Sequence, residues 1–321
     1  MKDLVSVIIP VYNGEATIEK AVRSVMACMQ SVDMEIVIVN DGSSDSSLSI
    51  IKRLAKDDSR IVVVDQKNMG VAGARNTGLR AARGNFITWC DADDWVEPDW
   101  IDCMYSRIKE YHADVVCFRA KLEGPGMRNN PYNPSEIIEW NRDQAIEAFL
   151  EHKRLNGCLP MKMFRTNVLS GISFDCSQRY WEDLAFVWKV LKKVDKVIRC
   201  NEGKYHYVMN PQSLCHEHMS KQRMRDSMMV WDNIVDDCSK EPFSSHQQSA
   251  SHHRIRVYID EMMLMFKDGY HDRDAEKKIQ TLLRKEGIKG LSSKDKLFVA
   301  LAIVCMPLSR LVASFLYKVR K

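Results

Sequence analysis

The sequence predicts an α/β protein with a mostly parallel, Rossmann-like sheet flanked by helices, followed by a helical C-terminal region. Short apolar, β-branched runs alternate with helical periodicity over roughly the first 120 residues, as in parallel sheets covered on both faces. Beyond about residue 217, helical spacing dominates. With 321 residues and 45% hydrophobic content, the chain can bury one large core or two modest ones.

The elements follow in order from apolar patterning. Strands are expected where apolar and β-branched residues run continuously, and helices where apolar residues recur every three or four positions. A stretch at 124–134 rich in Gly, Pro and Asn predicts a surface loop, and a polar interruption is expected at 239–251. The expected strands are 5–11, 35–40, 61–65, 85–90, 114–118, 161–165, 195–200 and 203–209, and the expected helices are 15–29, 48–54, 71–82, 98–108, 142–152 and 181–192.

Positive charge is concentrated near the C-terminus. The formal net charge is +4, but from Lys289 onward seven basic residues accompany Asp295 alone, which leaves about −2 for residues 1–288. This distribution does not predict a nucleic-acid partner. Ten cysteines without C-x-x-C spacing indicate free thiols in a reducing compartment. The first apolar run is too short for a signal peptide, so we expect a cytoplasmic location.

The stretch 297–317 is apolar but interrupted by Pro307 and Arg310. Its uninterrupted apolar run is about 12 residues, whereas a membrane-spanning helix needs about 20. Flanking basic residues favour a helix that lies at an anionic membrane surface. We therefore expect peripheral attachment at the inner face of the cell membrane. The alternative is a helix packed on the protein's own core.

Three carboxylates follow the fourth expected strand, at Asp91, Asp93 and Asp94. Ligands of open α/β sheets bind beyond the carboxyl ends of the strands. Crowded carboxylates repel one another unless a cation compensates them, and Mg²⁺ or Mn²⁺ prefers such oxygen ligands. The sequence therefore predicts a divalent-metal site at this strand tip.

Four motifs, in order, carry a family resemblance: V-S-V-I-I-P-V-Y-N-G, V-N-D-G-S-S-D-S-S, N-M-G-V-A-G-A-R-N-T-G-L and D-A-D-D-W. Together they resemble the family 2 inverting glycosyltransferases of bacterial surface-polysaccharide assembly, densely over roughly residues 4–120 and weakly to about 215. The resemblance implies the GT-A fold, a nucleotide-sugar donor (a UDP-sugar), Mn²⁺ or Mg²⁺, and a glycan or lipid-linked acceptor.

The resemblance also implies a donor site built from the strand tips. Asp41 would accept the N–H of a uracil ring, although an Asp before Gly42 also suits a turn. Glu15 is either a ligand or an acid of the first helical turn. Small residues around Arg75 would let the nucleotide approach the backbone. The implied donor contacts are Pro10, Val11, Tyr12, Asn13, Glu15, Asp41, Asn68, Arg75, Asp91 and Ala92.

The D-A-D-D motif resembles the metal-binding D-x-D element of the family. The resemblance implies Asp93 as a metal ligand, with Asp91 beside the ribose or sharing the metal. Asp94 is expected to bind donor sugar hydroxyls or to cap the following turn.

A second acidic element, Trp181-Glu182-Asp183, resembles the family's E-D pair at a helix start. It implies Asp183 as the general base that takes the acceptor's proton, with Glu182 orienting it or contacting the acceptor. An acidic first helical turn is the alternative. Trp181 is expected to stack on a sugar or pack in the core. His206 is a further donor-site candidate, and its neighbourhood lacks zinc-finger spacing.

The predicted function is a metal-dependent inverting glycosyltransferase. The expected divisions are a nucleotide-sugar-binding half (1–122), an acceptor-binding half (123–215), a helical region (216–290) and a basic amphipathic tail (291–321). A sugar-nucleotide nucleotidyltransferase is an alternative, but a Gly-rich phosphate loop after the first strand is missing from the sequence. A catalytically silent nucleotide-binding module is another. The spacing G-x-x-G-x-x-x-x-G after the third strand excludes a dinucleotide fingerprint.

Overall fold

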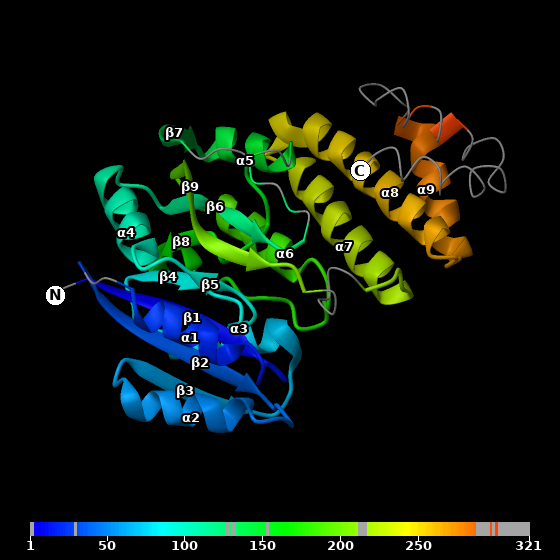
Figure 1. The fold of residues 1–321 in the computed structure, drawn as a ribbon. Coiled ribbons are helices and arrows are strands. Elements are labelled where there is room, and N and C mark those ends of the chain that lie inside the picture. Colours follow the sequence, from blue (N-terminus) through cyan, green and yellow to red (C-terminus); the bar gives the residue numbers. More distant parts are fainter. Residues whose placement is uncertain are drawn as a thin grey trace. The chain divides into compact units, whose positions relative to one another are not determined.

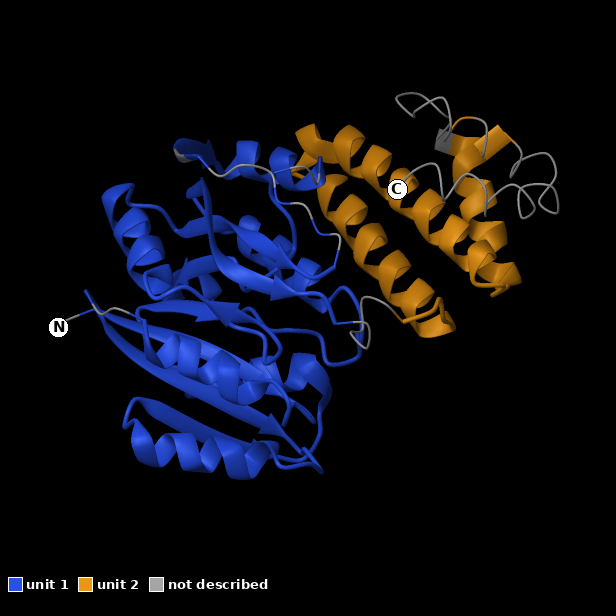
Figure 2. Ribbon diagram, in the orientation of Figure 1, with its two compact units in different colours: residues 1–213 blue, residues 214–321 orange. Residues whose placement is uncertain are grey.

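The chain folds into two compact units, residues 1–213 and residues 214–321, in the computed structural model (Figure 2). The structure describes residues 3–28, 31–125, 127, 129, 133–151, 154–210, 217–286, 296 and 299–300. The first unit contains the sheet, which confirms the predicted α/β fold class with its mostly parallel strands. The expected boundary at residue 122 stays a prediction.

Nine strands of the described residues form one sheet in the order β3-β2-β1-β4-β8-β6-β9-β5, with β7 paired to β9 (Figure 1). The first four strands run parallel, because a helix after each of β1, β2 and β3 returns the chain to the same end. β8 is antiparallel to both of its neighbours, and β6 is parallel to β9. The strands are β1 (Leu4–Val11), β2 (Asp33–Asp41), β3 (Ile61–Gln66), β4 (Phe86–Trp89), β5 (Trp95–Val96), β6 (Val115–Glu123), β7 (Asn133–Asn141), β8 (Lys162–Arg165) and β9 (Lys196–Val208).

Alternate residues of β1 face the two sides of the sheet, and helices cover both. Val7 belongs to a buried core shared with α1, α2 and α4. Ile8 points to the other side, where Gly78 of α3 lies so close that an added Cβ would sit 2.3 Å from Ile8 Cγ2. On the same side, Phe186 of α6 packs edge-on against Trp89, the partner of Ile8, with ring centroids 5.8 Å apart. The helices of this unit are α1 (Ile18–Met26), α2 (Ser47–Asp57), α3 (Gly70–Ala81), α4 (Trp100–Glu110), α5 (Arg142–Leu150), the 3₁₀ helix η1 (Thr166–Leu169) and α6 (Glu182–Leu191).

The second unit is helical over its described residues, with α7 packed on α8 and α8 on α9. None of the helices that the structure describes is both long and apolar enough to cross a membrane. The tail predicted at 291–321 lies outside the described residues apart from 296 and 299–300. The helices are α7 (Lys221–Cys238), the 3₁₀ helix η3 (Ser244–His246), α8 (Gln247–Lys267) and α9 (Arg273–Glu286).

Two sequence expectations were wrong in detail, and one strand was not predicted. The two short strands expected at 195–200 and 203–209 are one strand, β9, which shifts register against β6 near Arg119. The polar stretch at 133–141 forms β7, paired only to β9 among the described strands. The interruption expected to reach residue 251 ends earlier, because α8 begins at Gln247.

Candidate active site

The carboxylate loop after β4 is anchored to β9. The backbone N–H of Asp91 donates to the hydroxyl of Tyr205 (3.1 Å), and that hydroxyl donates to Asp94 Oδ2 (2.5 Å). The other Asp94 oxygen accepts the backbone N–H of Val208 (2.8 Å). Asp94 is 2% exposed, so its carboxyl holds the loop in place. Its predicted contact with donor hydroxyls stays a prediction.

The loop concentrates negative charge in a partly buried place. Burial and the charge of Asp91 raise the pKa of Asp94 to about 8, against the hydrogen bond from Tyr205, which lowers it. Burial and the same Asp91 charge raise the pKa of Asp93. The carboxyls of Asp93 and Asp94 therefore hold protons more tightly than free acids do, and a bound cation would relieve the repulsion within the loop.

Arg75 joins this loop to the second acidic element. Its Nη1 donates to Glu182 Oε1 at 2.5 Å, and its Nη2 lies 3.5 Å from Asp91 Oδ1. The side chain is buried under the ring of Phe174, 5.7 Å from the guanidinium carbon. Burial lowers the pKa of Arg75, but the charges of Glu182, Asp91 and Asp183 outweigh it and raise the pKa overall. The structure thus brings the two predicted acidic motifs together around one cation.

Glu182 and Asp183 begin α6. The preceding Trp181 is half-buried and has the left-handed φ of 65°, a conformation that costs energy for a residue other than glycine. The Oδ1 of Asp183 accepts the N–H of Leu184 at 2.7 Å. Burial raises the pKa values of both Glu182 and Asp183, and the charge of Arg75 opposes the rise in each. The pair therefore suits a proton acceptor that works near neutral pH.

Sequence reasoning missed a lysine beneath this helix start. Lys162 is 2% exposed, and its ammonium donates to Asn156 Oδ1 (3.1 Å) and to the carbonyl of Cys158. Its charge also lowers the pKa of Asp183. Gly157 lies between Asn156 and Cys158 in the sequence. It packs so closely against α6 that an added Cβ would lie 2.6 Å from Leu184 Cα. The signal in the sequence was a lysine inside the apolar run M-K-M-F, because lysine is buried only when it is paired.

The loops after β1 and β2 are tied to each other. Asn13, whose φ is 49°, accepts the N–H of Ser44 at 2.8 Å, and Glu15 accepts the N–H of Ser46, also at 2.8 Å. Tyr12 is 56% exposed beside them. These bonds fix the rim of the strand tips, where an exposed aromatic ring offers a surface for a nucleotide base.

Asp41 ends β2 and is 2% exposed. Its Oδ1 accepts from Gln66 Nε2 (2.7 Å) and from the backbone N–H of Met69 (2.8 Å). The loop between β3 and α3 lies against it, since a Cβ on Gly42 would come within 2.7 Å of the Asn68 backbone nitrogen. These contacts tie Asp41 to the loop before α3, and both its turn role at Gly42 and its base contact stay predictions.

The remaining residues predicted to contact the nucleotide-sugar donor lie at the same edge of the sheet. Pro10 and Val11 are buried at the end of β1, next to Val39 and Asn40 of β2. Ala92 is half-buried in the carboxylate loop, and the Cβ atom of Ala92 would lie 3.8 Å from one added to Gly14. The tips of β1 and β4 are therefore adjacent.

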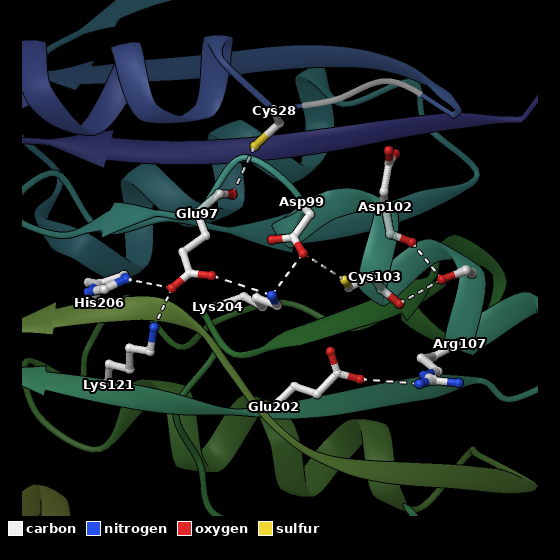
Figure 3. Close-up of polar contacts among 11 residues, drawn as sticks. Cys28, Glu97, Asp99, Asp102, Cys103, Arg107, Lys121, Glu202, Lys204 and His206 are labelled. Atoms are coloured by element: carbon white, nitrogen blue, oxygen red, sulfur yellow. Dashed lines mark hydrogen bonds and ion pairs between the residues drawn. The ribbon is translucent and has the colours of Figure 1, made fainter. Parts of the chain in front are cut away.

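His206 lies in a different group of side chains. Its ring stacks on Trp95 with centroids 3.4 Å apart, and its nitrogens lie 2.6 Å from Glu123 Oε1 and 3.3 Å from Glu97 Oε1. Figure 3 shows Glu97 also bound by Lys121 and Lys204. Successive side chains of a strand point to opposite faces, so His206 faces away from the Tyr205–Asp94 bond. The structure does not bring His206 to Arg75, and its donor role stays a prediction.

The metal prediction was tested against the side chains at the strand tip. Among the residues that the structure describes, no three His, Cys, Asp or Glu side chains form a group that could hold a metal ion. Asp91 and Asp93 offer two carboxylates. Mg²⁺ and Mn²⁺ typically take one or two carboxylates and complete their shell with substrate phosphates and water, so the residues present fit that arrangement.

Comparison with known proteins identifies the family. The profile of the family described as Glycosyl transferase family 2 matches residues 6–172. An uncharacterized glycosyltransferase of Bacillus subtilis, EpsJ, is 32% identical over 69% of this chain and 68% of its own. Glycosyltransferase GlyA of Streptococcus pneumoniae is 32% identical over 66% of this chain, which spans only 31% of that relative. The chain belongs to glycosyl transferase family 2, which confirms the resemblance seen in the motifs.

Solved structures share the fold. TarS of S. aureus in complex with UDP-GlcNAc matches with a TM-score of 0.74 at 19% identity, covering 100% of this chain and 93% of that one. The mannosyltransferase PcManGT of Pyrobaculum calidifontis, in complex with GDP-Man and Mn²⁺, matches with a TM-score of 0.52 at 14% identity, covering 98% and 88%. At these identities the likeness concerns the fold alone, and it agrees with the expected GT-A-type sheet.

Proposed function

We propose that this protein is a metal-dependent inverting glycosyltransferase of bacterial surface-polysaccharide synthesis. It transfers a sugar from a UDP-sugar onto a hydroxyl of a glycan or lipid-linked acceptor. One observation carries the proposal: Arg75 holds the carboxylate loop of β4 and the start of α6 in a single group. Donor-side and acceptor-side chemistry thereby meet in one place.

Asp183 is the general base in this proposal. The acceptor hydroxyl oxygen forms the new bond to the sugar's anomeric carbon, its proton passes to Asp183, and the bond to the departing UDP breaks with the electron pair leaving on the diphosphate. Burial raises the pKa of Asp183, which makes it a stronger base than a free aspartate. Glu182, bonded to Arg75, fixes the orientation of the helix start.

The donor lies over the tips of β1, β2 and β4. Asp41, Asn13 and Tyr12 lie at the base-binding end, while Arg75 and Asp91 lie toward the diphosphate. TarS complexes with UDP and with UDP-GlcNAc support a UDP-sugar donor. A poly(ribitol-phosphate) beta-glucosyltransferase of Bacillus spizizenii, 30% identical over 67% of this chain, supports a role in surface-polymer synthesis.

Asp93 and Asp91 would hold Mn²⁺ or Mg²⁺. The ion supplies positive charge that stabilises the departing diphosphate. Removing divalent cations with EDTA should abolish transfer, and Mn²⁺ should restore it. An Asp93→Asn variant should need a higher Mn²⁺ concentration than the wild type for half-maximal rate. Full activity in EDTA would refute the metal requirement.

The decisive experiment is a donor screen. Purified protein with Mn²⁺ and a panel of UDP- and GDP-sugars is assayed for release of nucleoside diphosphate. We expect release from at least one UDP-sugar, and about a thousandfold slower release in Asp183→Asn when an acceptor is present. Release of pyrophosphate from UTP and a sugar phosphate would instead indicate a nucleotidyltransferase.

The basic tail carries a separate proposal from the sequence alone. Residues 291–321 hold the protein at an anionic membrane surface through apolar contact and positive charge. A chain ending at residue 290 should move from the membrane fraction to the supernatant. A full-length protein that stays in the supernatant without detergent would contradict this attachment.

A further inference from the structure

The charges of two arginines from separate elements act on a third arginine. Arg119 is on β6, Arg199 is on β9 and Arg154 follows α5. The guanidinium of Arg119 donates to the amide oxygen of Asn201 at 2.7 Å. We refer to Arg119, Arg154 and Arg199 as the arginine cluster.

The guanidinium of Arg199 has room for a further partner. Arg199 is half-buried, and its side chain forms no hydrogen bond or ion pair with any residue that the structure describes. Burial is the largest cause of the lowered pKa of Arg199; the charge of Glu136 raises this pKa, and the charges of Arg119 and Arg154 lower it. Glu136 is itself engaged by the amide of Asn201 at 2.6 Å.

The strand register places Arg199 on the same face of the sheet as Lys162, whose charge acts on the proposed base. Lys162 and Arg199 both pair with Cys117, from the two strands that flank β6. Their side chains therefore point to the same face, roughly 10 Å apart at two strand spacings. Lys162 is close enough to lower the pKa of Asp183. Arg154 lies two residues before Asn156, whose side-chain oxygen accepts a hydrogen bond from the Lys162 ammonium.

Phosphate is the anion that suits this group. The planar guanidinium presents parallel N–H donors that match two phosphate oxygens. A half-buried guanidinium held near two others is repelled by them, and a doubly contacted phosphate removes that repulsion. A neutral sugar offers no such compensation.

We propose that the arginine cluster binds a phosphate group of the acceptor, so that the acceptor is phosphate-bearing. This inference rests on the proposed function, because it needs an acceptor hydroxyl at Asp183. The phosphate belongs either to a phosphodiester of a polyol-phosphate chain or to the diphosphate of a lipid-linked glycan. Both sources share the chemistry that the cluster recognises.

Calorimetry on the full-length protein tests the subsite. Saturating UDP and Mn²⁺ fill the donor site first, so that added phosphates cannot bind there. A glycerol phosphate hexamer and farnesyl diphosphate N-acetylglucosamine are then titrated separately. We expect at least one to bind, about tenfold more weakly to Arg199→Ala and more weakly also to Arg154→Ala, since each loses a charged hydrogen bond.

Arg53→Ala is the matched control, because Arg53 is an exposed arginine on α2 that pairs with Glu19. It should bind both probes as the wild type does. Weakening for the hexamer alone identifies a phosphodiester acceptor, and weakening for the farnesyl compound alone identifies a lipid diphosphate. Arg154 is exposed, so its variant decides the question if Arg199→Ala does not fold.

Two results separate this inference from the proposed function. If the wild type binds UDP but neither probe, or if the cluster variants match Arg53→Ala, the phosphate subsite is wrong and the glycosyltransferase proposal stands. If the wild type neither binds UDP nor hydrolyses any nucleotide sugar, the proposed function itself is wrong.

Discussion

The two units treat partly buried carboxylates in opposite ways. In the first unit, Arg75 acts on three carboxylates, those of Asp91, Glu182 and Asp183. Lys162 adds to its effect at Asp183. In the second, three donors serve one carboxylate: Arg254 at 3.0 Å, Tyr258 at 2.8 Å and Lys278 at 2.6 Å all reach Asp232. One arginine thus acts on three carboxylates in the first unit, whereas three donors bind one carboxylate in the second.

The pKa values follow from this difference. Burial alone would raise the pKa of Asp232, but Lys278, Tyr258 and Arg254 lower it overall. At Asp183 burial prevails over Arg75, and the pKa rises. A carboxylate that accepts hydrogen bonds from several donors connects helices, as Asp232 of α7 does with α8 and α9. A carboxylate with fewer donors remains available to take a proton. Buried charge therefore indicates function only once its partners are counted.

The largest expected effect is on catalysis. Asp183→Asn should lower kcat about a thousandfold, the usual scale for loss of a general base. Its melting temperature should not fall, because the change removes a buried charge. Nucleoside diphosphate release and thermal unfolding measure the two effects. Activity within threefold of the wild type would exclude Asp183 as the base.

The counterpart change in the second unit should act on stability instead. Asp232→Asn leaves Arg254 and Lys278 without their carboxylate and should cost about 2 kcal/mol, the scale of a charged hydrogen bond. Denaturant unfolding measures the loss, and the kcat of the folded variant should equal that of the wild type. A large fall in kcat would indicate that Asp232 acts in catalysis and would contradict this difference between the two units.

Asp94 should give the first unit a pH-dependent stability. Its pKa is raised from 3.8 to about 8, so between these values the folded chain holds a proton that the unfolded chain has released. Its contribution to stability is therefore full below about pH 4 and is lost as the pH rises toward 8. Asp94→Asn stays neutral, so its melting temperature should fall less between pH 5 and pH 8. Parallel pH profiles for the two proteins would contradict the raised pKa.

The smallest effect is expected at His206. Its buried ring contacts Trp95, Glu97 and Glu123 and not the group around Arg75, so His206→Ala should change the KM for the donor by less than about threefold. A tenfold or greater rise in KM, with unchanged melting temperature, would restore the donor-site role that its position in the sequence suggested.

The first half of the fold was predictable because its strands are apolar throughout and buried on both faces. β1 and β2, for example, are buried over nearly their whole length, and such runs are distinctive. β7 was missed because it pairs at the margin of the sheet and carries polar residues such as Ser135 and Glu136, so its pattern resembles a loop. Edge strands are commonly polar because one side faces solvent.

For the candidate site, spacing along the chain indicated which residue types occur at the strand tips, but not which way side chains point. The meeting of Arg75 with Glu182 depends on α3 and α6 covering the same face, which no local pattern encodes. His206 illustrates the same limit, since one step along β9 separates it from Tyr205 and sends it to the other face. Lys162 was overlooked because a lysine in a strand usually faces water.

The bond between Arg75 and Glu182 spans 107 residues, and this separation bears on when activity arises during synthesis. At about 5–20 residues per second, the ribosome adds Glu182 roughly 5–20 s after Arg75. During that interval the nascent chain already carries β1 to β4 and their strand-tip loops, but not α6. If Asp183 is the base, as we propose, a chain that ends before α6 cannot transfer a sugar.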